Sequence, residues 1–302
     1  MDALVISGGG SKGAFAGGVS EYLIKIQQKD YKLFVGTSTG SLLVPFLALG
    51  DIERIKKIYT TIRQEDIFTV CPFIIKNKNG VVTTRMNHFG ILKQFFKRQK
   101  TLGDSTALRT LIRKSFTKED FKQIRKLGKE VVVTVSNLTT QAIEYKSSND
   151  CNYNDFCDWI WASANMVPLM SLVQKNGNEY ADGGFGNLIP IQEAIFKGAS
   201  YIDVIVLRLK DGVYNNPPLH NALDSFARTY DFMLNQIAID DLLIASLQAK
   251  SRNVTVAFYY INRLLTTRSF IFNAVEMKEW WKEGFEMYQD AQCERHYLAA
   301  KV

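Results

Sequence analysis

Short apolar runs and helical patterns alternate along the first part of the chain. Apolar runs at 3–7 and 33–35 both stop at glycines, as buried strands often do. Apolar residues recur at helical spacing over 14–28 and 41–49, and Asp51 is suited to cap a further helix. Strands and helices in this order, with short connections, predict a mostly parallel sheet covered by helices.

Similar patterns continue to the end of the chain. The further strands that we predict are 130–136, 142–145, 180–181, 201–209 and 254–261. The further helices are 88–99, 105–116, 118–127, 156–165, 190–197, 220–250 and 275–299. The fold class expected is therefore α/β, with three layers in the order α/β/α and a mostly parallel central sheet.

No linker divides the chain. The 302 residues contain six prolines and no low-complexity tract, so a single domain over 1–302 is expected. Its catalytic core is expected at about 1–70 and 130–212. Between these parts we expect a basic helical insertion at about 74–129, and after them a helical C-terminal region at about 213–302.

The positive charge is concentrated in one region. The chain has a formal net charge of +7, and residues 76–129 contain 15 Lys or Arg against three acids, which gives +12 there and −5 elsewhere. Apolar residues interleave with Lys93, Lys97 and Arg98. The segment either docks on anionic membrane headgroups or is a solvated face over a buried stripe, and both interpretations stay open. No nucleic-acid-binding module is recognisable, so no nucleic-acid partner is expected.

The N-terminus and the cysteines bear on location. MDALVISGGG has no basic n-region and no small-residue cleavage site, and no apolar stretch reaches the ~18 residues of a membrane span. The four cysteines show no CxxC spacing, which disfavours a disulfide framework or a zinc site. We expect a cytoplasmic protein without a signal peptide or transmembrane helix, peripheral at a membrane if 76–129 docks there. Export by a route without a signal peptide stays open.

A glycine-rich stretch, SGGGSKGAFAGG, follows the first strand and opens the first helix. Gly8, Gly10 and Gly13 fit G-x-G-x-x-G, the dinucleotide-binding fingerprint, and Asp30 is at about the distance of the acid that binds the ribose. However, Asp30 precedes the second strand, whereas that acid belongs at its carboxyl end. Backbone N–H groups at a helix N-terminus also bind oxyanions. A cofactor site, an oxyanion hole and a plain tight turn stay open at this point.

Residues 36–40, GTSTG, fit G-x-S-x-G between an apolar strand and an apolar helix. A serine on such a strand-to-helix turn needs small neighbours, because the turn is strained and adjacent chains crowd it. The positive end of the following helix would favour a negative charge that develops at Ser38. A helix-capping serine is the alternative, but the flanking strand and helix favour a nucleophile.

The candidate base is an aspartate rather than a histidine. A serine needs a base before it can attack, and His88, His220 and His296 have no catalytic-looking neighbours in the sequence. Asp182 ends a short strand and precedes two glycines, so its carboxylate could approach another loop closely. Asp-Gly-Gly alone is merely a turn, and Asp182 gains its interest from the two motifs before it.

Together these segments resemble the patatin-like phospholipase family of acyl hydrolases. That family combines G-G-G-x-[KR]-G, a G-x-S-x-G elbow and a later D-G-[GA], which correspond here to 8–13, 36–40 and 182–184. Residues 162–168, ASANMVP, resemble the Ala-Ser…Pro block that the family places before its aspartate. The resemblance says little about 70–130, so it bears on the chemistry more than on the choice of lipid.

The resemblance implies a patatin-like fold and a Ser-Asp dyad without histidine. Ser38 would attack a lipid ester, and Asp182, with a pKa raised by burial, would accept the proton. Backbone N–H groups around Gly9 and Gly10 would hold the oxyanion, while Gly36 and Gly40 shape the nucleophile elbow. The stretch expected to form the oxyanion hole is Gly8, Gly9, Gly10, Ser11, Lys12 and Gly13. No metal and no organic cofactor is implied.

The expected function is a lipid acyl hydrolase of the phospholipase A or lysophospholipase type, acting on membrane or micellar lipid. Two alternatives stay open: a catalytically idle lipid-binding or storage protein, and a dinucleotide-binding enzyme. A conventional Ser-Asp-His hydrolase with His220 or His296 as base is a variant of the first function. The lipid class, the sn position, the oligomeric state and an activator stay open.

Overall fold

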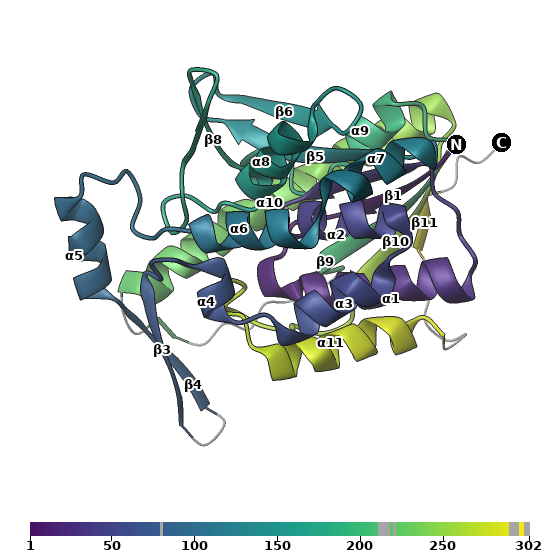
Figure 1. Ribbon diagram of the computed structural model, residues 1–302. Helices are drawn as coiled ribbons and strands as arrows, with labels where there is room; N and C mark the ends of the chain where they lie inside the picture. The colour runs from purple at the N-terminus through teal and green to yellow at the C-terminus, as the bar shows by residue number, and fades with distance from the viewer. Residues whose placement is uncertain (79–80, 211–217, 220–221, 290–295, 299–302) are drawn as a thin grey trace.

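The computed structural model describes residues 1–78, 81–210, 218–219, 222–289 and 296–298 (Figure 1). Its strands are β1 (Asp2–Ile6), β2 (Leu33–Thr37), β3 (Phe73–Lys78), β4 (Val81–Met86), β5 (Glu130–Asn137), β6 (Ala142–Ser147), β7 (Val173–Lys175), β8 (Asn178–Asp182), β9 (Tyr201–Leu209), β10 (Thr255–Ile261) and β11 (His296–Leu298). Its helices are α1 (Gly13–Glu21), α2 (Thr39–Leu49), α3 (Ile52–Thr61), α4 (Gln64–Ile67), α5 (His88–Phe96), α6 (Thr106–Ser115), α7 (Lys118–Lys126), α8 (Tyr153–Ser163), α9 (Ile191–Phe196), α10 (Ala222–Arg252) and α11 (Ala274–Met287).

The central sheet is mostly parallel, as predicted. Its strand order is β11-β10-β9-β1-β2-β5-β8-β7, with β6 also paired to β5. Strands β10, β9, β1, β2 and β5 run parallel, while β6, β7, β8 and β11 pair antiparallel with their neighbours. The carboxyl ends of β1 and β2 therefore meet at one edge of the sheet, which is where open α/β sheets bind ligands.

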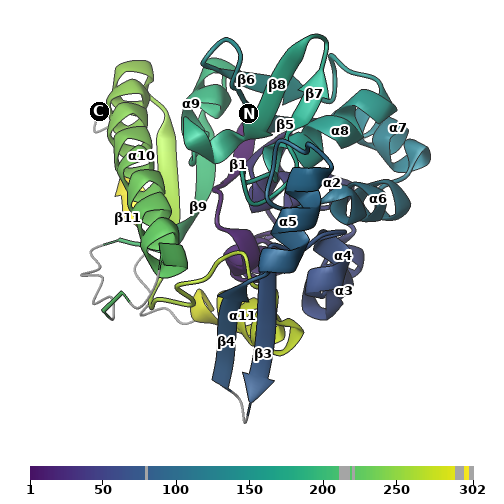
Figure 2. The same cartoon turned by 90° about the vertical axis from the view of Figure 1, so that its left-hand side faces the viewer.

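The sheet is buried on both faces. In β1, Leu4 and Ile6 belong to one hydrophobic core, and Ala3 and Val5 belong to the other, because successive side chains of a strand point to opposite faces. Helices α1, α2, α3, α8 and α11 cover the first face, and α9 and α10 cover the second (Figures 1 and 2). The expectation of three layers in the order α/β/α is confirmed.

Three parts of the structure correct the sequence-based expectation. The basic insertion begins with the β3–β4 hairpin, not with a helix. In the sequence, Ile74-Ile75 and Val81-Val82 lie on either side of Asn-Gly, a dipeptide typical of hairpin turns. The last helix ends at Met287 rather than at 299, and 296–298 pair with β10 as an edge strand. The C-terminal region labelled helical also extends the sheet, through β10, which agrees with the strand predicted at 254–261, and through β11, which was not predicted. The predicted helix start at 220 lies outside the described residues.

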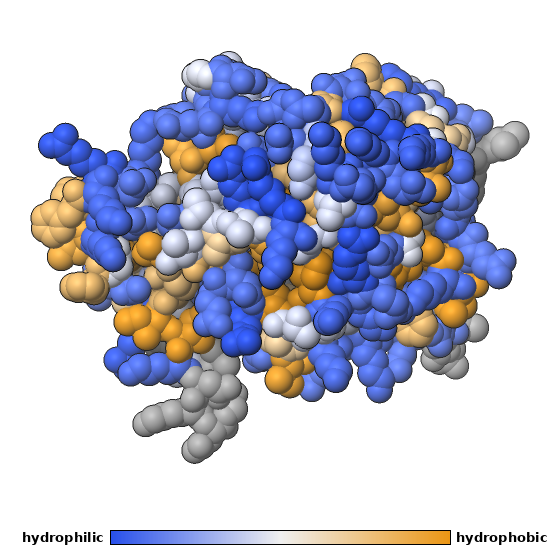
Figure 3. Space-filling model, viewed as in Figure 1, coloured by the Kyte–Doolittle hydropathy of each residue, from blue (hydrophilic) through white to orange (hydrophobic). Residues whose placement is uncertain are grey.

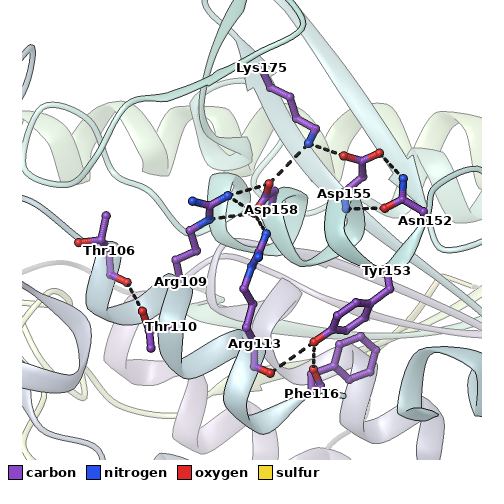
Figure 4. A network of polar contacts seen from close by, with 10 residues as sticks. All are labelled: Thr106, Arg109, Thr110, Arg113, Phe116, Asn152, Tyr153, Asp155, Asp158 and Lys175. Atoms are coloured by element: carbon purple, nitrogen blue, oxygen red, sulfur yellow. Dashed lines mark hydrogen bonds and ion pairs between the residues drawn. The ribbon is translucent and has the colours of Figure 1, made fainter. Parts of the chain in front are cut away.

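Much of the basic segment is tied into the fold. Arg109 and Arg113 of α6 both donate to the Asp158 carboxylate of α8, at 2.9–3.0 Å (Figure 4). Lys175 Nζ lies 3.5 Å from the same carboxylate, on Oδ2, and Tyr153 donates its hydroxyl hydrogen to the Phe116 carbonyl. These charges fix α6 against α8, so they do not form a free cationic surface.

Candidate active site

Ser38 lies on a sharp turn between β2 and α2. Its φ of 55° and ψ of −120° are unusual for a residue with a side chain and store backbone strain. A Cβ on Gly36 would lie 2.5 Å from the carbonyl carbon of Gly40, and one on Gly40 would lie 2.3 Å from the Ile6 oxygen. Only glycine fits at both positions, so the turn is tight and crowded, as a nucleophile elbow requires. The role of Ser38 as a nucleophile stays a prediction.

Asp182 is buried at the end of β8. Asp182 is only 3% exposed, and its Oδ1 accepts a hydrogen bond from the Gly184 N–H at 2.8 Å. Burial raises the pKa of Asp182 to about 7, while the nearby Ser38 hydroxyl and the Gly184 amide lower it in part. Both side chains line the same cavity, and the Oδ2 atom of Asp182 has no hydrogen-bond partner among the described residues. The carboxyl keeps one oxygen available for a proton.

A single segment holds both Ser38 and Asp182. The Ser38 N–H donates to the Ser163 hydroxyl at 3.1 Å, and the Asp182 N–H donates to the Asn165 carbonyl at 2.8 Å. Both acceptors belong to 162–168, the stretch whose likeness to an Ala-Ser…Pro block was noted from the sequence. That stretch therefore sets the distance between the two side chains.

The glycine-rich stretch offers fewer N–H groups than the sequence suggests. Four of its six amides already donate within the protein. Their acceptors are the carbonyls of Leu188 for Gly8, Ser269 for Ser11, Gly9 for Lys12, and Gly10 and Ser11 for Gly13. No hydrogen bond within the described residues uses the N–H of Gly9 or Gly10. Gly8, Ser11, Lys12 and Gly13 therefore shape the loop, and only Gly9 and Gly10 have free amides.

A cavity joins these groups. About 800 Å³ of empty space, counting its open mouth, is lined by Ser38, Asp182 and residues 8–10 together with apolar side chains. A second, almost entirely apolar pocket of about 540 Å³ adjoins it. The two share four lining residues, which are Leu42, Ile67, Leu108 and Phe272. No histidine is among the described residues that line either space.

The cavity is also lined by polar residues, and most of these lie outside the sequence motifs. Lys12 lines it beside the glycines, and the more distant part of the chain contributes Arg208, Asp231 and Leu234. The loop that contains Ser269 also closes over the glycine stretch, where a Cβ on Gly10 would lie 2.1 Å from the Ser269 oxygen. Gly10 has a φ of +58°, so glycine is favoured there for its backbone as well.

The alternative site residues lie elsewhere. Asp30 precedes β2 at the edge of the sheet opposite Ser38, and its exposed side chain pairs with Lys32 and Lys129. It is therefore placed away from the glycine stretch and cannot serve a nucleotide there. His88 begins the protruding helix α5, and β10 and β9 separate the strand of His296 from β1. His220 lies outside the described residues. The described residues contain no group of three or more His, Cys, Asp or Glu placed to hold a metal ion.

The family follows from the sequence match over the part of the chain that builds this site. Residues 4–195, well over half of the chain, match the family described as patatin-like phospholipase. The chain belongs to the patatin-like phospholipase family. The matched residues include the glycine stretch, Ser38 and Asp182, so the elbow, the buried carboxyl and the free amides all lie in the patatin-like part.

Two known proteins are similar to this patatin-like protein. It is 25% identical over 195 residues to "Probable lipid hydrolase 463L" of Invertebrate iridescent virus 6, which covers 64% of this chain and 62% of the relative. It also aligns with the crystal structure of VipD from Legionella pneumophila, with 15% identity and a TM-score of 0.45, over 94% of this chain and 65% of that one. The chain thus spans less than two thirds of the length of either protein.

Proposed function

We propose that this protein is a lipid acyl hydrolase that uses Ser38 and Asp182 as a catalytic dyad. The observation that carries the proposal is the meeting of three features in one cavity: a serine on a strained elbow, a buried carboxyl with an open oxygen, and two free amides. Family membership and a relative named as a lipid hydrolase support the same reaction class.

The first half-reaction forms an acyl-enzyme. Ser38 Oγ attacks the ester carbonyl carbon as its proton passes to Asp182 Oδ2, and the N–H groups of Gly9 and Gly10 stabilise the oxyanion. Each such donor contributes about 3–4 kcal/mol to the transition state. The C–O bond to the alcohol then breaks, and the proton on Asp182 goes to the departing oxygen.

The second half-reaction releases the fatty acid. Asp182 takes a proton from water, the hydroxide attacks the acyl carbonyl, and the Ser38 oxygen leaves with the proton from Asp182. A carboxylate in water is too weak a base for these steps. Burial, which raises the pKa of Asp182 to about 7, brings its basicity near that needed at neutral pH.

The apolar pocket beside the cavity suits the acyl chain. Its lining is almost wholly aliphatic and aromatic, and Leu108 borders both spaces while being only 3% exposed. A fatty acyl chain that enters there removes about 25 cal/mol of unfavourable hydration per Å² of apolar surface. The pocket therefore favours long-chain esters over short ones.

We expect Leu108→Trp to shorten the acyl preference, because the indole would fill the passage between the two spaces. The ratio of palmitoyl- to butanoyl-ester kcat/KM should fall by about tenfold or more. Leu127→Trp is the control, since Leu127 is 40% exposed and borders neither space.

Fatty-acid release from phospholipid, lysophospholipid and acylglycerol is measured with the wild type. No release from any of them would refute the proposed function, and an unchanged ratio would refute the acyl pocket.

We also propose that helix α5 docks on the membrane that holds the substrate. Figures 1 and 2 show α5 standing away from the sheet, beside the β3–β4 hairpin, and Figure 3 shows hydrophobic surface at that end of the molecule. Phe89, Phe95 and Phe96 are 82%, 76% and 76% exposed. No described acid pairs with Lys93 or Lys97 of the same helix. Exposed aromatic rings next to free cations are typical of interfacial helices on anionic lipid. No described helix has the length and apolar character of a membrane span.

Phe95→Ser/Phe96→Ser is expected to weaken binding to anionic vesicles about tenfold or more, because two inserted rings are lost. Vesicle sedimentation measures the change. Phe196→Ser is the matched control, since Phe196 is also 76% exposed but ends α9. Equal loss in both variants would contradict docking through α5, as would unchanged binding in the double variant.

A further inference from the structure

Two buried basic side chains line the same cavity as Ser38 and Asp182. These are Lys12 and Arg208, whose residues are only 6% and 7% exposed. Lys12 follows the glycine stretch, whereas Arg208 lies on β9, beyond the residues that match the family. A buried charge is costly unless it is paired, so cations placed here call for an anionic partner.

The described residues accept only some of the hydrogen bonds that Arg208 can donate. Its Nη1 donates to Asn235 Oδ1 at 2.9 Å, and its Nη2 lies 3.7 Å from Asp231 Oδ1. The Asp231 side chain is 48% exposed, so this long ion pair is weakened by water. The buried Nε–H of Arg208 has no hydrogen-bond partner in the described part of the chain. The guanidinium therefore has a donor to spare.

The ammonium group of Lys12 also lacks a direct partner among the described residues. No acid or hydrogen-bond acceptor among the described residues pairs directly with it. Burial, and next the positive charge of Arg208, lower the pKa of Lys12 to about 8, and Asp231 opposes this only in part. An anion bound between the two cations would offset their mutual repulsion and their loss of hydration.

We propose that Lys12 and Arg208 form a subsite that binds the phosphate group of a glycerophospholipid while its acyl ester lies at Ser38. This proposal rests on the proposed hydrolase function and narrows its substrate class. A guanidinium presents N–H groups in a fixed plane that match phosphate oxygens, and an ammonium adds a compact charge.

The subsite and the apolar pocket lie on opposite sides of the cavity. Arg208 comes from β9 and Asp231 from α10, whereas Leu42, Ile67 and Leu108 come from α2, α4 and α6. Figure 2 shows β9 and α10 on one side of β1, and α4 and α6 on the other. A phospholipid can thus direct its headgroup toward Arg208 and its acyl chain toward Leu108, with the ester between them.

The test measures binding without turnover. Calorimetric titration with dihexanoyl phosphatidate, below its micelle concentration, compares Ser38→Ala with Ser38→Ala/Arg208→Gln. Loss of charge-assisted hydrogen bonds is expected to weaken binding about 10- to 100-fold, and Arg208→Lys should restore part of it. Asp231→Asn in the same background removes a competing carboxylate and should tighten binding about threefold. Arg263→Gln is the control, since Arg263 pairs with Glu283 at the surface.

Further ligands separate the outcomes. Dihexanoylglycerol has no phosphate. The factor by which Arg208→Gln weakens its binding should be at least ten times smaller than the factor for the phosphatidate. Inorganic phosphate that binds as tightly as the phosphatidate would assign the subsite to a free anion and overturn the headgroup assignment. The subsite would be overturned if Arg208→Gln and Arg208→Lys bound the phosphatidate as tightly as the protein with Arg208, and if Asp231→Asn did not tighten binding. Arg208-dependent binding without fatty-acid release by the wild type would support the subsite and refute only the hydrolase function.

Discussion

Replacing Ser38 by alanine is expected to reduce fatty-acid release by about 10⁴-fold or more, because the reaction loses its nucleophile. Alanine keeps the Cβ that already occupies the elbow and removes only the hydroxyl. The fold and the binding of lipid should therefore persist. Fatty-acid release from anionic phospholipid vesicles measures the loss, and circular dichroism checks the fold.

Ser246→Ala is the matched control for this experiment. Its hydroxyl donates to the Leu242 carbonyl within α10 and does not line the cavity, so activity should be retained. Residual activity of Ser38→Ala above about a tenth of the wild type would contradict its role as nucleophile. A wild type that binds vesicles but releases nothing would favour the idle lipid-binding protein instead.

The position of Ser38 could be predicted because its determinants are local. A strand that ends in glycine, a serine, and a small residue before an apolar helix specify a crowded turn wherever they occur. The backbone of Gly36 and Gly40 in the structure meets that requirement. The alternating order of strands and helices was predictable for the same reason, since strands β5 and β9 are mostly apolar runs.

The free amides of the glycine stretch could only be predicted coarsely. A glycine motif says that backbone approaches a ligand, but it does not say which amides are free. In the structure the Leu188 carbonyl accepts a hydrogen bond from the Gly8 N–H, and the Ser269 carbonyl accepts one from the Ser11 N–H. These acceptors are distant in sequence. The resemblance therefore points to amides around Gly9 and Gly10, but only the folded chain shows that the other amides of the stretch are engaged.

Arg208 and Asp231 were not predictable for a related reason, whereas Lys12 lies in the glycine stretch that the sequence singles out. Arg208 is the last residue but one of a mostly apolar strand, and Asp231 is one polar position of a long amphipathic helix. Neither has a neighbour in the sequence that points to chemistry. The β3–β4 hairpin differs in this respect, because Asn79-Gly80 between apolar pairs was a turn signal that the helical interpretation of the basic segment overlooked.

Asp182→Asn is expected to reduce fatty-acid release by about 10³-fold, because an amide cannot accept the Ser38 proton. Release should survive in His220→Ala/His296→Ala, which is the control for a histidine base. Loss of activity in the histidine variant, with Asp182→Asn still active, would reverse the assignment and favour a Ser-Asp-His arrangement.

The pH profile tests the same assignment in the wild type. The base acts in its ionised form, so a pKa of about 7 predicts that kcat/KM falls about tenfold per pH unit below pH 7 and levels off above it. A neutral ester is the suitable substrate, because Lys12, with a pKa of about 8, would add a second limb with phosphorylated lipid. A profile that stays flat down to pH 5 would contradict a buried aspartate base.

The stability of Asp182→Asn should change in the opposite direction to its activity. A carboxyl whose pKa is raised from 3.8 to about 7 on folding favours the folded state below pH 4, and this contribution is lost as pH rises to 7. Above pH 7 the ionised side chain therefore destabilises the fold, and asparagine, which carries no charge, should raise the free energy of unfolding by roughly 2 kcal/mol. Urea unfolding at pH 8 and pH 4 measures this, with the gain expected at pH 8 alone. A variant that is both inactive and less stable at pH 8 would indicate a structural role for the carboxylate. A buried base that is ionised at this pH destabilises the folded state, so its removal should make the protein more stable.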